Sequence, residues 1–324
     1  MRACVRDLYG SPDVLKLQDI DKPVVKDDGV LVQVRASSLN SGDLDYLYGR
    51  PLIARLGIGL RKPTHRGLGL DVAGEVEAVG KDVSHLRPGD EVFGDMTSHG
   101  FGAFAEYVCA PARAFALKPA TMTFEEAATV PQSAVIALQG LRHRRQIQPG
   151  DRVLINGAAG SVGPFAVQIA KHLGAEVTGV DSTSKLGMLS SIGADHVIDY
   201  TREDFTRTGQ RFDLILDLVA RRSIFECRRA LRPNGVYVLV GGATGRLLQA
   251  AVVGPLISMR GRRKMGIMWW WKPFNQEDVA FLKELIDAGI LAPVIDRRYP
   301  LSAVPEALRY LEGGSSRGKI VITV

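Results

Sequence analysis

The chain has 324 residues, of which 46% are hydrophobic and 23% are charged, and its formal net charge is +6. These proportions are typical of a soluble globular protein with room for two domains, and they exclude a largely disordered chain. The positive surplus can attract an anionic cofactor, an anionic substrate or a membrane surface. Because no block of basic residues is interleaved with aromatics, we expect no specific nucleic-acid partner.

The cysteine content and the apolar stretches indicate the compartment. Cys4, Cys109 and Cys227 lie far apart, so we expect neither a disulfide framework nor a four-cysteine zinc lobe, and we predict a reducing, cytoplasmic location. The first ten residues lack the apolar run of a signal peptide. The longest apolar stretch, residues 247–259, is shorter than the ~20 residues of a membrane span, so we interpret it as a buried or mobile segment near the site.

Residues 1–122 are predicted to form a β-rich, barrel-like substrate domain. In residues 29–40 the apolar residues alternate, with Val30, Val32 and Val34 on one face, which is typical of a half-buried strand. Turn-forming residues separate this strand from the other predicted strands of the domain, which cover residues 71–80, 86–94 and 103–111.

Residues 123–265 are predicted to form a nucleotide-binding domain of alternating strands and helices. The predicted strands cover residues 152–156, 176–180, 196–200, 212–219 and 235–241, and the predicted helices cover residues 162–173, 184–192 and 223–231. Such alternation builds a parallel sheet with helices on both faces, so the fold class is α/β.

Residues 266–324 are predicted to return to the first domain. They contain two helical patterns, residues 277–289 and 303–313, and a final strand, residues 319–324. They also contain three consecutive tryptophans, residues 269–271. Because neighbouring side chains diverge, we expect at least one of these tryptophans to face a cleft or a partner chain.

A glycine-rich turn follows the first strand of the second domain. Glycines at this point permit a tight turn and a close approach of the backbone, so that a pyrophosphate can sit at the N-terminus of the next helix. The spacing departs from the G-x-G-x-x-G pattern, because an alanine takes the place of its first glycine. The turn nevertheless predicts a dinucleotide site, with candidate residues Gly157, Ala158, Gly160, Ser161, Val162 and Gly163.

The end of the next strand leaves the choice of cofactor open. Asp181 lies about 20 residues after the glycines, where an acid binds the ribose 2′-hydroxyl and favours NAD. Ser182, Thr183 and Lys185 follow at once, and hydroxyls with a lysine suit a 2′-phosphate, which favours NADP. Alternatively, Asp181 caps the next helix.

Six segments together carry a family resemblance: "GLDVAGEVEAVG", "RPGDEVFG", "GAFAEYV", "GAAGSVGPFAVQIAK", "GADHVIDY" and "RGKIVI". In this order they resemble the medium-chain dehydrogenase/reductase superfamily, and more closely its zinc-independent quinone oxidoreductase branch. The resemblance implies a GroES-like barrel domain, a Rossmann domain with a doubly wound parallel sheet, and a homodimer.

The zinc-binding members of that superfamily carry a Gly-His-Glu motif where this chain has Gly69, Leu70 and Asp71, and a cysteine where it has Asn40. Leucine cannot bind zinc and asparagine is a poor substitute for a thiolate, so we expect no metal. Without a Lewis acid, the cofactor must carry the reaction. The resemblance therefore implies an NADPH-dependent reductase of a small quinone or α,β-unsaturated carbonyl. The alternatives are an enoyl-thioester reductase and a non-catalytic, cofactor-binding regulatory protein.

The resemblance also implies further cofactor contacts. Ser182, Lys185 and Tyr200 fall where NADPH-dependent relatives hold the 2′-phosphate, so we expect NADP, with NAD possible because of Asp181. Ala220 takes the place of a glycine in the family's Asp-x-Val-Gly motif. The remaining residues expected at the cofactor are Val219, Gly241, Arg317 and Lys319.

Two residues of the first domain are candidates for the chemistry. Asn40, which we expect on a loop at the end of the barrel, can donate a hydrogen bond to the substrate oxygen. Tyr46 can donate a hydrogen bond or serve as the proton source. Asp43 is expected to orient the loop.

Overall fold

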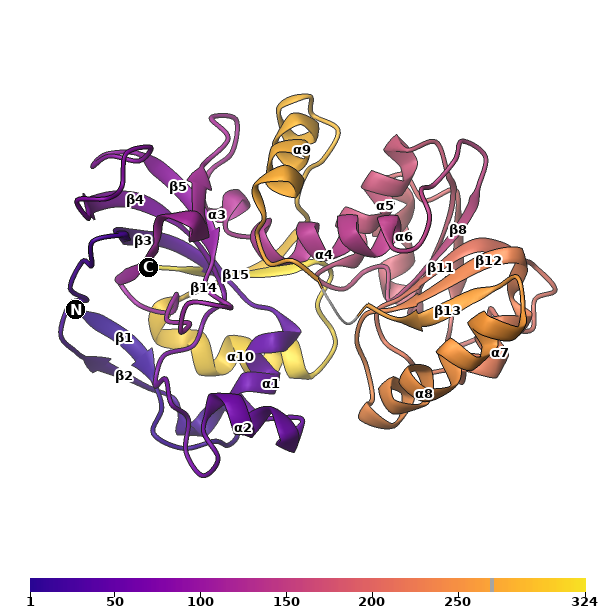
Figure 1. Ribbon diagram of the computed structural model, residues 1–324, viewed down its shortest axis with the longest axis horizontal. Helices are drawn as coiled ribbons and strands as arrows, with labels where there is room; N and C mark the ends of the chain where they lie inside the picture. The colour runs from indigo at the N-terminus through magenta and orange to yellow at the C-terminus, as the bar shows by residue number, and fades with distance from the viewer. Residues whose placement is uncertain (269–270) are drawn as a thin grey trace. The chain divides into compact units, whose positions relative to one another are not determined.

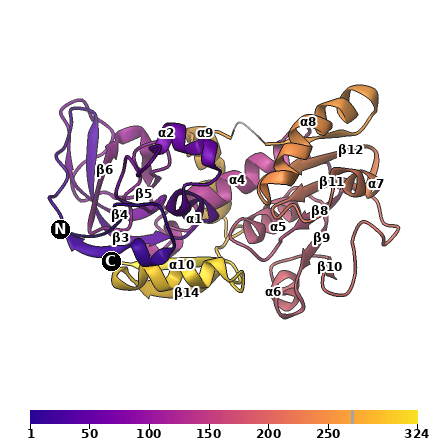
Figure 2. The same ribbon diagram turned by 90° about the horizontal axis from the view of Figure 1, so that it is seen from below.

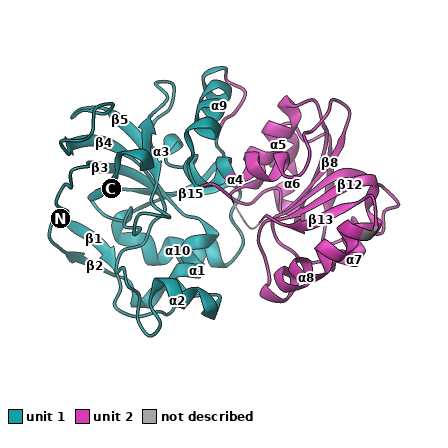
Figure 3. Ribbon diagram, viewed as in Figure 1, with its two compact units in different colours: residues 1–135, 273–288, 293–324 teal, residues 136–272, 289–292 magenta. Residues whose placement is uncertain are grey.

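The computed structural model describes residues 1–268 and 271–324. They divide into two compact units (Figure 3): unit 1 comprises residues 1–135, 273–288 and 293–324, and unit 2 comprises residues 136–272 and 289–292. The borders thus lie later than the predicted ones at 122/123 and 265/266. Trp269 and Trp270, on which the expectation about the three tryptophans depends, lie outside the described residues.

Unit 1 is built on a seven-stranded sheet centred on β3 (Gly29–Ser38), as the alternation of valines predicts. Val30, Val32 and Val34 are buried in one core with Phe115. The path through the sheet is β14 (Ile295–Pro300), β15 (Lys319–Thr323), β3, β4 (Asp71–Val79), β5 (Glu91–Asp95) and β7 (Phe115–Leu117), and β6 (Tyr107–Pro111) pairs with β3. A separate pair is formed by β1 (Arg2–Val5) and β2 (Lys16–Asp19).

The last strand of the chain belongs to unit 1, as predicted. In β15, Val321, Ile322 and Thr323 lie antiparallel to Ser38, Ser37 and Ala36 of β3. The helices α9 (Gln276–Asp287) and α10 (Val304–Glu312) also belong to this unit, and α10 packs against β14 and β15. The helix α3 (Phe124–Ala127) contacts β3, β4 and β15, which explains why the border lies beyond residue 122.

Asn40 lies on the short connection, residues 39–40, between β3 and the helix that follows, so the predicted loop position agrees with the structure. It is the N-cap of α1 (Ser41–Tyr48), where its backbone N–H donates to Asp43 Oδ2 at 2.8 Å. Asp43 is therefore the acidic partner of a capping box, and Gly49, with φ at +64°, ends the helix in the left-handed conformation. The capping box therefore fixes the backbone of Asn40 at the N-terminus of α1.

Unit 2 contains a six-stranded, fully parallel sheet. Its order is β10 (His196–Asp199), β9 (Glu176–Asp181), β8 (Arg152–Asn156), β11 (Phe212–Asp217), β12 (Leu231–Leu239) and β13 (Lys264–Ile267). Figures 1 and 2 show α5 (Gly163–His172) and α6 (Leu186–Ser191) on one face, and α7 (Ile224–Arg229) and α8 (Thr244–Arg260) on the other. This is the doubly wound arrangement that the sequence predicts.

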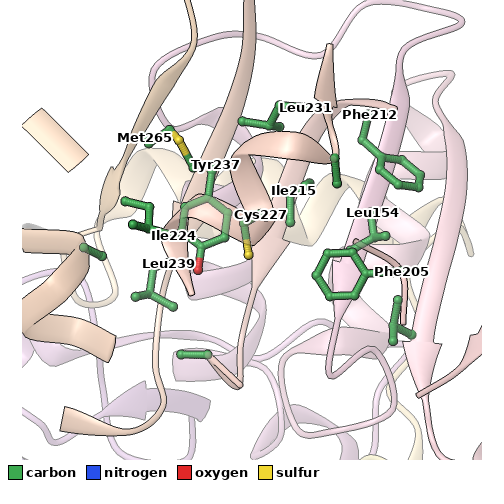
Figure 4. Packing of buried hydrophobic residues seen from close by; sticks show 14 of the residues in the cluster. Leu154, Phe205, Phe212, Ile215, Ile224, Cys227, Leu231, Tyr237, Leu239 and Met265 are labelled. Carbon is green, nitrogen blue, oxygen red and sulfur yellow. The ribbon is translucent and has the colours of Figure 1, made fainter. Parts of the chain in front are cut away.

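A continuous hydrophobic core fills unit 2 beside β11 and β12. Figure 4 shows Leu154, Ile215, Tyr237 and Cys227 among the side chains that pack there. Tyr237 is 2% exposed, and its hydroxyl donates to the buried carboxylate of Asp217 at 2.9 Å. The Tyr237 hydroxyl is thus a polar group within the core, and its hydrogen bond is accepted by the carboxylate of Asp217 at the end of β11.

Residues 247–259 lie in α8, and only one face of this helix is buried, so the prediction of a buried segment holds for that face alone. Leu247 and Ile257 pack on the core, whereas four side chains at helical spacing face outward: Leu248, Val252, Leu256 and Met259, which are 61%, 65%, 50% and 82% exposed. Because both faces of α8 carry apolar side chains, the sequence does not show which face is buried. Within the described parts of the chain, no helix combines the length and apolarity of a membrane span.

Candidate active site

The glycine-rich turn after β8 has the shape of a phosphate cradle. The N–H groups of Gly157 and Ala158 donate to the Val180 carbonyl at 3.0 and 3.1 Å, which fixes the turn on β9. A Cβ atom added at Gly163 would lie 2.2 Å from the Ala158 carbonyl oxygen, so this glycine permits close packing of α5 on the turn. A Cβ atom at Gly160 would meet only Gly157 O, at 3.5 Å, so its surroundings are open.

The predicted turn residues therefore fit a dinucleotide cofactor. Pro164 lies in the first turn of α5, where its missing N–H has no helical partner to lose. Ser161 and Val162 complete the half-buried turn before the helix N-terminus. Backbone N–H groups and an open glycine next to a helix N-terminus are the features that hold a pyrophosphate.

A buried carboxylate shapes the loop at the carboxyl end of β11. Asp217 accepts hydrogen bonds from the N–H groups of Val219 at 3.2 Å and Ala220 at 2.9 Å, and from Asn156 Nδ2 at 2.9 Å. Burial raises the pKa of Asp217, and the hydrogen bonds oppose that shift. Asp217 thus ties the loop after β11 to the end of β8, although sequence reasoning named it only as part of a motif.

One of the two glycines after β12, Gly242, is required by close contact with this loop. A Cβ atom at Gly242 would lie 2.5 Å from both the Val219 carbonyl oxygen and the Ala220 Cβ. Ala220 itself has φ at +49°, a region that glycine adopts at lower cost. The predicted residues Val219, which is 36% exposed, and Gly241 border this junction of loops. They lie at the carboxyl edge of the parallel sheet, where ligands bind in such folds.

Asp181 is directed toward the protein. Its Oδ2 accepts from the Ala159 N–H and its Oδ1 from the Ser182 N–H, both at 2.9 Å. The ammonium of Lys185 lies 3.7 Å from Oδ1, so it balances part of the carboxylate charge. The alternative in which Asp181 caps the next helix is not observed, because Ser182 precedes the turn Thr183–Lys185 and no side chain caps it.

Tyr200 has a neighbour that sequence reasoning missed. The Arg221 guanidinium lies over the Tyr200 ring, 4.8 Å from its centroid, and both side chains are exposed. The Tyr200 N–H donates to the Asp181 carbonyl at 3.1 Å, so this pair borders the end of β9. Arg221 follows β11 rather than β9, and no sequence signal connects it to the predicted 2′-phosphate residues.

In unit 1, Asn40 is the centre of a buried polar network. Asn40 is 3% exposed; its Nδ2 donates to Asp71 Oδ2 at 2.9 Å, and its Oδ1 accepts from Ser133 Oγ at 3.2 Å. Asp71 is also held by the Gln132 N–H on its Oδ1 at 3.0 Å and by Ser38 Oγ on its Oδ2 at 2.9 Å.

Lys319 joins the same network. Its Nζ donates to Asn40 Oδ1 at 2.7 Å, to Ser133 Oγ at 3.0 Å and to Asp71 Oδ2 at 3.2 Å. Burial lowers the pKa of Lys319, and Asp71 opposes that shift. Its predicted companion Arg317 is exposed, on the loop before β15. The two basic residues of the "RGKIVI" segment therefore have different surroundings.

Tyr46 is half-buried on α1 and packs against Phe101, with ring centroids 4.3 Å apart. Burial, followed by the charges of Asp95, Asp43 and Asp45, raises the pKa of Tyr46, so its hydroxyl keeps the proton that a hydrogen-bond donor needs. Phe101 has φ at +63°, between two glycines that also have positive φ, which marks a constrained loop beside this side chain.

Leu70 and Asn40, which replace zinc ligands in the sequence comparison, are both buried in unit 1. Among residues 1–268 and 271–324, no group of three or more His, Cys, Asp or Glu side chains could hold a metal ion. The groups gathered around Asn40 are hydroxyls, the Lys319 ammonium and the Asp71 carboxylate, and the last two offset each other's charge.

Comparison with known families matches both parts of the chain. Residues 26–120 match the alcohol dehydrogenase GroES-like domain, and residues 192–322 match a family described as zinc-binding dehydrogenase. The sequence is 34% identical to a 2-methylene-furan-3-one reductase of Solanum lycopersicum, over 97% of this chain and 76% of that protein. It is 33% identical to a chloroplastic NADPH-dependent alkenal/one oxidoreductase of Arabidopsis thaliana, over 99% of this chain and 79% of that protein.

The fold is also similar to solved structures. A quinone oxidoreductase from Coxiella burnetii aligns with a TM-score of 0.89 and 32% identity, over 100% of this chain and 99% of that one. The GroES-like and Rossmann domains predicted from the sequence are therefore confirmed.

Two glycines of the turn provide a matched test. We expect Gly163→Ala to lower the free energy of unfolding by about 1–3 kcal/mol, because its Cβ overlaps the Ala158 carbonyl. Gly160→Ala should change that free energy by less than ~1 kcal/mol, since its Cβ has room. It should nevertheless weaken binding of a nicotinamide cofactor. Chemical denaturation and fluorescence titration measure the two effects, and unchanged cofactor affinity in Gly160→Ala would contradict the assignment.

Proposed function

Because this chain belongs to the medium-chain dehydrogenase/reductase superfamily, in its quinone oxidoreductase-like branch, we propose that it transfers hydride from NADPH to a quinone or an α,β-unsaturated carbonyl. The single observation that carries the proposal is the buried network of Asn40, Asp71 and Lys319, in which an asparagine amide stands where zinc-binding relatives have a ligand cysteine and is held by an ammonium–carboxylate pair. The names of the reductases similar to this chain support the same substrate classes.

The bound cofactor would supply hydride, and the substrate carbon must already be electron-poor because we propose a zinc-independent reaction. The protein then has to place the acceptor and stabilise negative charge on its oxygen. Asn40 Nδ2 is the proposed hydrogen-bond donor to that oxygen. The Tyr46 hydroxyl is a proposed second donor; its raised pKa favours a hydrogen-bond donor over a proton source.

We propose NADPH as the cofactor, with Ser182, Lys185, Tyr200 and Arg221 around the 2′-phosphate. Two observations support this choice. Each oxygen of Asp181 already accepts a backbone N–H group and the residue is 7% exposed, so part of its hydrogen-bonding capacity is used within the protein. Lys185 and Arg221 add two positive charges beside that region. For the other predicted contacts, Gly241 and Arg317 remain proposals.

Turnover assays test the proposed reaction. We expect the purified protein to oxidise NADPH with quinones or enones, to remain active after treatment with a chelator, and to contain no stoichiometric zinc. Activity with enoyl-thioesters alone would favour the alternative reductase. Tight cofactor binding without turnover of any acceptor would instead favour a regulatory protein, and zinc-dependent turnover would contradict the metal-free reaction.

The 2′-phosphate assignment can be tested with one lysine and a matched control. We expect Lys185→Ala to weaken NADPH binding about 10- to 100-fold, because a charge-assisted hydrogen bond is worth about 1.5–3 kcal/mol, and to affect NADH much less. Lys171→Ala is the control, since Lys171 pairs with Asp195 at 2.7 Å and should leave both affinities unchanged. Equal losses for the two cofactors on titration of Lys185→Ala would contradict the assignment.

We also propose a cytoplasmic homodimer. The three cysteines form no disulfide, as suits a reducing compartment. The exposed apolar stripe of α8 supports self-association, because such patches mark interfaces. Beside it, β13 is the open edge of the parallel sheet.

Sedimentation measurements test the dimer. We expect a dimer at micromolar concentration and a monomer for Val252→Glu, because the substitution places a charge in the centre of the stripe. The control is Val24→Glu, at a residue that is 86% exposed in unit 1, and it should stay dimeric. A monomeric wild-type protein would exclude the dimer.

A further inference from the structure

The ammonium of Lys319 is fully buried, and all three of its hydrogen bonds are made within unit 1. Its three acceptors are Asn40 Oδ1, Ser133 Oγ and Asp71 Oδ2, which match the three hydrogens of an ammonium. The shortest of the three bonds, 2.7 Å, is to the neutral amide oxygen, and the contact to the carboxylate is 3.2 Å. The positive charge of Lys319 therefore lies closer to the amide oxygen of Asn40 than to the carboxylate oxygen of Asp71.

The network also determines how the Asn40 amide is turned. Because Oδ1 faces two donors, Lys319 Nζ and Ser133 Oγ, it must be the oxygen, and Nδ2 must face the Asp71 carboxylate. One Nδ2 hydrogen is used by Asp71. The second has no acceptor among the residues that the structure describes.

We propose that Lys319 is a positioning residue whose ammonium polarises the Asn40 amide, so that the remaining Nδ2–H binds the substrate oxygen as negative charge develops there. This inference rests on the proposed function. A positive charge on the amide oxygen withdraws electron density from the nitrogen and strengthens the N–H as a donor. Burial makes such a donor more effective than it would be in water.

This role of Lys319 predicts that the effect of removing its ammonium depends on which substrate is reduced. A quinone is electrophilic without help, whereas an enone needs stabilisation of its developing enolate oxygen. Loss of the ammonium should therefore slow enone reduction more than quinone reduction. Cofactor affinity should not change, because Lys319 Nζ is engaged with Asn40, Ser133 and Asp71, which distinguishes this role from a direct contact with NADPH.

Lys319→Met removes the charge but leaves the Asp71 carboxylate buried without its cation, and this variant can fail to fold. The double variant Lys319→Met with Asp71→Asn removes both charges, and its new amide oxygen can accept from Asn40 Nδ2 while its NH2 group faces the Gln132 N–H. If the pair served only the fold, the double variant would regain stability relative to Lys319→Met, and any loss of turnover would be equal with both substrates. If the ammonium polarises Asn40, the double variant would be folded and still deficient with enones.

The experiment compares kcat/KM of the wild type and both variants with one enone and one quinone, together with NADPH affinity and thermal unfolding. We expect the folded variants to lose roughly 10- to 100-fold with the enone and less than about a third of that factor with the quinone, at unchanged NADPH affinity. A folded double variant with wild-type enone turnover, or equal losses with both substrates, overturns the inference alone. Absence of turnover in the wild type overturns the proposed function, and this inference with it.

Discussion

The chemistry proposed for unit 1 depends on one buried contact, the hydrogen bond from Lys319 to the amide oxygen of Asn40. A charge that is removed from water is costly unless it is paired and hydrogen-bonded, and here Asp71 and Ser133 provide those partners. Because Oδ1 and Nδ2 of Asn40 have different partners, the side-chain amide of Asn40 is held in one orientation. Asn40 is fixed a second time from its backbone, through the capping box that begins α1.

Unit 2 uses a carboxylate in a comparable way. Asp217 is buried at the end of β11, where it accepts two N–H groups from the following loop and holds Asn156 and Tyr237. The loop therefore has one conformation, in which Ala220 adopts a positive φ and Gly242 can approach it closely. Both units thus shape a site by satisfying one buried charged group with several local donors or acceptors.

The glycine-rich turn shows that residues of one motif have different tasks. Gly163 is required by its contact with the Ala158 carbonyl, whereas Gly160 has open space around it. The sequence pattern treats both positions alike. Their separation into a packing position and a position open to a ligand needs the backbone coordinates, because the distance to neighbouring atoms is not a property of the local sequence.

The sequence by itself predicted the β-rich first part and the alternation of strands and helices over residues 152–241, because hydrophobic periodicity is a local signal. Six segments in order also predicted the family, by their resemblance to it. The sequence placed Asn40 correctly on a loop but did not identify the capping box that Asn40 forms with Asp43, and it did not separate the buried from the exposed face of residues 247–259. Only the tertiary structure joined Lys319 to Asn40, which are 279 positions apart, and Tyr200 to Arg221. The first contact arises because β15 pairs with β3, and the second because β10 and β11 lie in one parallel sheet. No periodicity along the chain records either contact.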